Sequence, residues 1–128
     1  MRSFSDQLDT FPGKLRAIKE TIITNITFLG QIPAPTFHEK QRAIKFLDRL
    51  VEADVDECTT DGYQNPIGII RGRDGSRAPI VVVAHLDTAF GKDVDHNFTI
   101  TENMIQGPGV LDNSVGIGTM ASLPTIFK

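Results

Sequence analysis

Apolar side chains in the first quarter of the chain recur every three or four residues. Between Lys14 and Leu29 the recurring positions are Ile18, Ile22, Ile26 and Leu29. An α-helix has about 3.6 residues per turn, so this spacing places the four side chains on one face. The pattern predicts an amphipathic helix with a buried apolar face and with Gly30 as its C-cap.

The next stretch combines a helix breaker with a helix start. Pro33 and Pro35 do not fit a helix interior, because proline lacks the backbone donor and its ring clashes with the preceding turn. Thr36 and Glu39 then form the T-x-x-E pattern of a capping box. The apolar positions that follow are Ala43, Phe46, Leu47 and Leu50. We therefore expect a second helix from Thr36, also with one buried face.

Short apolar runs separated by turn residues come next, and they predict β-strands. Residues 55–59 and 66–71 each favour a short strand, and residues 73–76 supply turn chemistry. The five residues from Ile80 to Ala84 are continuously apolar, which is typical of a strand buried on both faces. The short connection between residues 69 and 82 permits an antiparallel hairpin, but it is too short for a parallel crossover.

The last third of the chain predicts a hairpin and a helix. Residues 98–100 and 104–106 alternate around a polar turn, and a helix is expected from Ser114 to Phe127, bent or ended by Pro124. Helices, then strands, then a helix indicate an α/β fold with a mixed β-sheet flanked by helices. A chain of 128 residues fits a single domain over residues 1–128.

Composition narrows the function classes. Thirteen basic and sixteen acidic residues give a net charge of −3, without a long run of either sign. This balance argues against a dedicated nucleic-acid-binding protein and against a basic membrane-binding patch. The sequence shows no signal-peptide core and no apolar stretch near the roughly 18 residues that span a bilayer. The single cysteine, Cys58, cannot form an internal disulfide, so we expect a reducing compartment, the cytoplasm.

The candidate chemistry lies at the end of the predicted strand over residues 80–84. His85 follows this run directly, and Asp87 comes two residues later. Ligands in open α/β sheets bind just beyond strand carboxyl ends, and residues two apart on a strand face the same side. A metal-bound histidine usually has its second ring nitrogen held by a carboxylate or a carbonyl. The H-x-D pattern therefore offers a metal ligand and a residue that orients it; the alternative is a solvated pair without function.

A second carboxylate, Asp112, lies in the glycine-rich stretch 107–116, at an expected loop-to-helix junction. The glycines permit backbone geometries and close approaches that other residues avoid. Aspartate is also a good N-cap, so Asp112 taken alone would only cap the following helix. Together with the H-x-D pair upstream, a shared site is the better interpretation. The remaining histidines, His38 and His96, are expected at the surface.

Three stretches of the sequence resemble peptidase family M20, which comprises zinc aminopeptidases, carboxypeptidase-like enzymes and amidohydrolases. The stretches are V-A-H-L-D-T at residues 83–88, G-P-G-V-L-D-N-S-V-G at residues 107–116 and I-P-A-P-T-F-H-E at residues 32–39. The first is similar to the H-x-D block of the family, the second to its glycine-rich block around a bridging aspartate, and the third to an early segment before a helix. Order and spacing agree, so the resemblance covers most of residues 14–123.

The resemblance implies a site with two zinc ions. His85 would ligate one zinc ion, Asp112 would bridge both ions, and Asp87 would be the catalytic aspartate that orients the His85 imidazole. The family often has a cis peptide after the bridging aspartate, here between Asp112 and Asn113. The implied reaction is hydrolysis of a peptide or related amide bond, with deacylation of N-acyl amino acids as the alternative within the family.

The resemblance also implies parts that this sequence does not match. In the family, a glutamate pair beyond the bridging aspartate supplies the general base and a ligand, and a further acidic ligand and a late histidine complete the site. None of these has a counterpart up to Lys128, and the family's lid domain and the C-terminal half of the catalytic domain are absent too.

We therefore expect residues 1–128 to be the N-terminal portion of an incomplete zinc-exopeptidase-like catalytic domain. Zinc binding should be weak or absent and the chain alone inactive, because catalytic zinc usually has about three protein ligands. A non-catalytic α/β domain that binds a partner is the remaining alternative. Exposed sheet edges would favour self-association.

Overall fold

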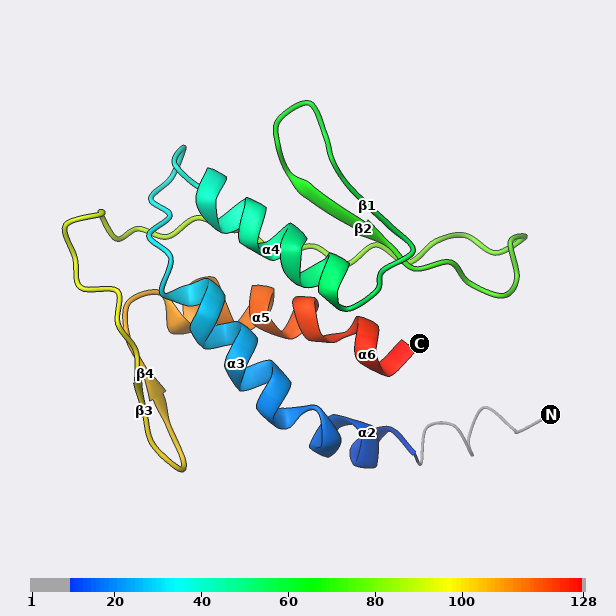
Figure 1. Cartoon of the computed structure of the whole chain (residues 1–128), viewed down its shortest axis with the longest axis horizontal. Coiled ribbons are helices and arrows are strands. Elements are labelled where there is room, and N and C mark those ends of the chain that lie inside the picture. The colour runs from blue at the N-terminus through cyan, green and yellow to red at the C-terminus, as the bar shows by residue number, and fades with distance from the viewer. Residues whose placement is uncertain (1–9, 128) are drawn as a thin grey trace.

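The structure is a computed structural model, which describes residues 10–127, and helices form most of its regular structure (Figure 1). In chain order the elements are α2 (Phe11–Ala17), α3 (Lys19–Gly30), α4 (Lys40–Glu52), β1 (Glu57–Thr60), β2 (Pro66–Ile69), β3 (Thr99–Ile100), β4 (Ile105–Gln106), the irregular turn η1 (Val110–Ser114), α5 (Val115–Ser122) and α6 (Pro124–Phe127). The described residues thus combine helices with small antiparallel sheets, which agrees with an α/β chain in the broad sense. No helix among them is long and apolar enough to cross a bilayer.

The two predicted helical regions in the first half of the chain are confirmed, but their ends are shifted and the first region is divided at Ile18 into α2 and α3. Ile26 and Leu29 of α3 are buried, and Gly30 is the last helical residue instead of the cap. The second helix, α4, begins at Lys40 rather than at Thr36, and the predicted capping box is wrong. Glu39 accepts a hydrogen bond from the backbone N–H of Phe37 at 2.6 Å, and the Thr36 hydroxyl bonds Asp87 instead of the helix end.

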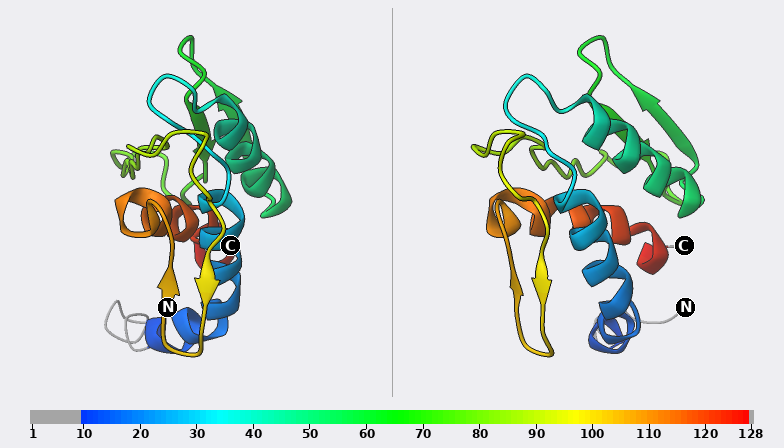
Figure 2. Two further views of the ribbon diagram at one scale, coloured as in Figure 1. Left: turned by 90° about the vertical axis from the view of Figure 1, so that its left-hand side faces the viewer. Right: turned by 60° about the vertical axis from the view of Figure 1, so that its left-hand side comes forward.

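The core lies where α3, α4 and α5 meet, and Figures 1 and 2 show α3 crossing α5. Its buried members are Leu29, Phe46, Leu50, Ile117 and Ala121. The crossing is close at Gly118, where an added Cβ would lie 2.5 Å from the backbone nitrogen of Ile26. The predicted C-terminal helix is also confirmed, with a break at Leu123 before Pro124 begins α6.

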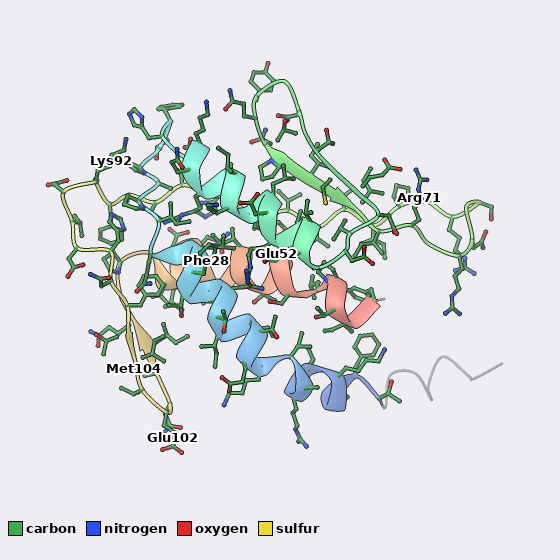
Figure 3. All side chains as sticks on the ribbon, viewed as in Figure 1. Phe28, Glu52, Arg71, Lys92, Glu102 and Met104 are labelled. Atoms are coloured by element: carbon green, nitrogen blue, oxygen red, sulfur yellow. The ribbon has the colours of Figure 1, made fainter. Side chains whose placement is uncertain are left out.

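Two hairpins accompany the helices. β1 and β2 pair antiparallel, with Glu57 opposite Ile69 and Thr60 opposite Pro66, and they pack on α4. β3 and β4 form the hairpin predicted over residues 98–106, and Glu102 lies at its tip (Figure 3). The hairpin expected between residues 69 and 82 is wrong, because β2 pairs with β1 instead. The strands of the described residues form two separate two-stranded antiparallel sheets, so the expected single mixed sheet is wrong.

The run from Ile80 to Ala84 departs most from expectation. It forms no strand, and the side chains of Ile80 and Val83 are 93% and 83% exposed. The prediction of a buried strand is wrong because burial of such a run depends on neighbouring strands, and within residues 10–127 no strand pairs with it. Contact with the core begins only at Ala84 and Leu86, beside the candidate site.

Candidate metal centre

The backbone over residues 84–88 is fixed from two sides. Ala84 and Leu86 pack against the core between the helices. On the other side, the backbone N–H of Thr88 donates to the carbonyl of Ala34 at 2.8 Å, and Thr88 forms an isolated parallel bridge with Pro35. The segment that carries His85 and Asp87 is therefore joined to the turn that follows α3.

His85 lies between two carboxylates. Its Nδ1 is 3.1 Å from Oδ1 of Asp87 and 3.2 Å from the Asp87 carbonyl oxygen. Its Nε2 is 2.8 Å from Oδ1 of Asp112, which is 27 residues away in the sequence. The structure thus brings together the three residues that the sequence singles out. Asp87 fixes one ring nitrogen, so the other faces the second carboxylate.

Both carboxylates favour the charged imidazole. Desolvation lowers the pKa of His85, but the hydrogen bonds to Asp87 and Asp112 and the charges of both carboxylates outweigh it, so the pKa of His85 is raised. A histidine must lose its proton to bind a metal ion through that nitrogen. A cation held between His85 Nε2 and Asp112 would occupy the place of that proton.

Asp87 is itself oriented by Thr36. The Thr36 hydroxyl donates to Oδ2 of Asp87 at 2.7 Å, while Oδ1 faces His85. This hydroxyl bond is the main cause that lowers the pKa of Asp87, and His85 lowers it further against desolvation. Sequence reasoning assigned Thr36 to a helix cap and missed this role. The only sequence signal was its place in the I-P-A-P-T-F-H-E segment.

Asp112 projects from the irregular turn η1, whose two ends are joined by hydrogen bonds. Gly109 has a φ of 70°, in the left-handed region that favours glycine, and its carbonyl accepts hydrogen bonds from the backbone and hydroxyl of Ser114. The peptide between Asp112 and Asn113 is cis, as the resemblance implies. No side-chain hydrogen bond caps α5, so the alternative role of Asp112 as its N-cap is wrong.

The donor atoms fit zinc in type and nearly in spacing. Zinc binds imidazole nitrogen and carboxylate oxygen at about 2.0–2.2 Å in a tetrahedron, which places two ligand atoms roughly 3.3 Å apart. The distance of 2.8 Å between His85 Nε2 and Asp112 Oδ1 is shorter than this ideal by about 0.5 Å. Both side chains have room to adjust, since they are 51% and 87% exposed.

The set of zinc ligands is nevertheless incomplete. Catalytic zinc usually has about three protein ligands. Within residues 10–127, no group of three or more His, Cys, Asp or Glu side chains is arranged to hold a metal ion. The described residues therefore present two candidate ligands, His85 and Asp112, with Asp87 behind the histidine.

The other histidines lie apart from these contacts. His38 is exposed, as expected. His96 is buried, which corrects the expectation of a surface residue, and its Nε2 lies 2.9 Å from the carbonyl of Gly91. Both partners of this contact belong to the polar loop over residues 89–97, whose local polarity did not indicate a buried histidine.

Comparison with models of known protein families finds no match for this chain, and no curated protein matches it.

Proposed function

We propose that this chain contributes to a zinc-dependent hydrolase site of the M20 type, which acts on peptide or related amide bonds. The observation that carries the proposal is the linked arrangement of Thr36, Asp87, His85 and Asp112. A histidine whose Nδ1 is held by a carboxylate, and whose Nε2 meets a second carboxylate, is typical of zinc ligation.

Each residue has a distinct task in this proposal. His85 Nε2 and the Asp112 carboxylate bind zinc, Asp87 holds the imidazole in the required tautomer, and Thr36 holds Asp87. Bound zinc supplies a Lewis acid and lowers the pKa of a bound water. The zinc-exopeptidase-like fold and the cytoplasmic location belong to the same proposal.

The chain alone is expected to bind zinc weakly and to be inactive, because residues 10–127 offer only two ligands to the ion. Deacylation of N-acyl amino acids is the alternative reaction of the same site, since it too is hydrolysis of an amide bond. A non-catalytic, partner-binding domain is the second candidate function. The exposed apolar run over residues 80–83 favours it, because such a run offers a surface to another chain.

Zinc titration of the purified chain tests the leading proposal. The protein is stripped with a chelator, and zinc affinity is measured by competition with a chromophoric chelator. His85→Ala and Asp112→Ala should abolish the weak binding, because each removes one of two ligands. His38→Ala is the matched control, since it removes an exposed histidine, and it should bind zinc like the wild type.

One result would contradict the proposed site, and another would contradict only the expectation that the chain alone is inactive. Equal zinc affinity in the wild type and in His85→Ala would show that zinc, if bound, lies elsewhere. Zinc-stimulated hydrolysis of peptides by the purified chain, lost in His85→Ala, would support the site but contradict the expectation that the chain alone is inactive.

A further inference from the structure

Arg42 of α4 is a fully buried cation that contacts the backbone beside the candidate site. Its exposure is 0%. Within the described residues its guanidinium donates to three carbonyl oxygens: those of Ile32 (3.0 Å from Nε and 2.5 Å from Nη2), Gly30 (3.1 Å from Nη2) and Leu86 (2.7 Å from Nη1). Leu86 lies between His85 and Asp87, so one arm of the guanidinium holds the peptide from which both side chains project.

The other two carbonyls lie at and just beyond the end of α3: Gly30 is its last residue, and Ile32 belongs to the turn that follows. The last carbonyls of a helix lack intrahelical partners and carry partial negative charge, so a cation there is favourable. Arg42 satisfies Gly30 and Ile32 at this end and Leu86 across from it. The planar fork of arginine makes these three contacts from one fixed group, which the compact ammonium of lysine cannot reproduce.

Arg42 stays charged in spite of its burial. Desolvation lowers its pKa to about 10, and the negative charge of Asp87 acts in the opposite direction. At neutral pH the guanidinium therefore remains a cation that attracts Asp87 and binds the Leu86 carbonyl. An apolar side chain of similar size would fill the space but would leave one buried and two partly buried carbonyls without these donors.

We propose that Arg42 is a positioning residue for the candidate metal centre: by holding the Leu86 carbonyl against the end of α3, it sets the directions of His85 and Asp87. This inference rests on the proposed zinc site. It differs from a general stabilising role because it predicts a loss of metal binding beyond what a loss of stability explains.

Arg42→Met, Arg42→Lys and Asn25→Ala separate these roles. Asn25 is the matched control, since it is also buried and bonds Ser122 and Arg49 without touching residues 85–88. Zinc affinity is measured under conditions where circular dichroism shows each variant folded. Arg42→Met should lower zinc affinity about 10- to 100-fold, as for other groups that orient metal ligands, Arg42→Lys should recover part of it, and Asn25→Ala should leave it unchanged.

A second readout needs no metal. The backbone N–H of Thr88 bonds Ala34 on the same segment, so its hydrogen exchange, measured by NMR, should speed up in Arg42→Met and not in Asn25→Ala. Folded Arg42→Met with wild-type zinc affinity, or an equal loss in Asn25→Ala, would overturn the inference. If the wild type binds no measurable zinc, the expectation that the chain alone binds zinc weakly fails. Unchanged Thr88 exchange in Arg42→Met would then separately refute the positioning role of Arg42. Should Arg42→Met not fold, Arg42→Gln takes its place in both measurements.

Discussion

Replacing Gly118 by alanine should destabilise the protein, although alanine is the better helix former. The added Cβ would lie 2.5 Å from the backbone nitrogen and 2.6 Å from the Cα of Ile26. Backbone atoms cannot rotate away, so α3 and α5 would have to separate by roughly 1 Å to reach ordinary contact distance. Such a shift would also loosen the packing of Leu29 against Ile117, both of them buried in the shared core.

The magnitude follows from two opposing effects. Helix propensity favours alanine over glycine by about 0.8–1.0 kcal/mol. Overpacking typically costs about 1–3 kcal/mol, and a contact with rigid backbone belongs at the upper end of that range. The expected net loss is about 2 kcal/mol in the free energy of unfolding, or roughly 8 °C in Tm for a chain of this size.

Thermal and urea unfolding, followed by circular dichroism, measure this change. Gly13→Ala is the matched control, because it makes the same substitution in a helix, α2, where nothing lies within 4 Å of the added Cβ. That variant should equal or slightly exceed the wild type in stability. Wild-type stability of Gly118→Ala would refute the reasoning, since it would mean that α3 and α5 do not approach as closely as described.

Three further predictions concern the site and the surface. Thr36→Val, which removes the donor to Asp87, should weaken zinc binding several-fold in the chelator titration while Thr36→Ser retains it; equal affinities would rule out the orienting role. The pKa of Asp61 is lowered from 3.8, chiefly by its hydrogen bond from the Asn65 side chain. The contribution of Asp61 to the stability of the protein is therefore complete above about pH 4, and it is lost as the pH falls through the lower pKa of the folded state. Urea unfolding between pH 2 and 6 should show this acid-dependent loss in the wild type and less of it in Asp61→Ala; parallel profiles would contradict it. Val81→Lys should reduce concentration-dependent self-association in sedimentation experiments, and a wild type that stays monomeric at high concentration would argue against association through the apolar run.

The spacing of apolar residues along the chain was enough to predict the helices. The spacing of Ile26 and Leu29 predicted α3, and Phe46 and Leu50 marked the buried face of α4. Alternation around a polar turn predicted the β3–β4 hairpin, but the pairing of β1 with β2 was not predicted. The run over residues 80–84 failed for a physical reason: a continuous apolar sequence indicates burial, but only a neighbouring strand can provide it.

The residues of the candidate site could be predicted from the sequence, but the residues that hold them in position could not. His85 and Asp87 are close in sequence, and the glycine-rich stretch around Asp112 together with the family resemblance indicated that Asp112 shares their site. Thr36 satisfied a local capping pattern, which concealed its bond to Asp87. Arg42 had one usable signal: it stands four residues before Phe46 and so on the buried face of α4, where a charged residue requires partners.

The contacts of Thr36 and Arg42 determine the smallest part of this protein that could carry the candidate site into another protein. A peptide over residues 83–114 would contain His85, Asp87 and Asp112, yet it would lack the hydroxyl and the guanidinium that aim them. Grafting the site into another scaffold would therefore require three separate pieces of backbone: the end of α3 with the start of α4, the segment around Leu86, and the turn before α5. The smallest unit that could be grafted is therefore a set of contacts between chain segments that lie far apart in sequence.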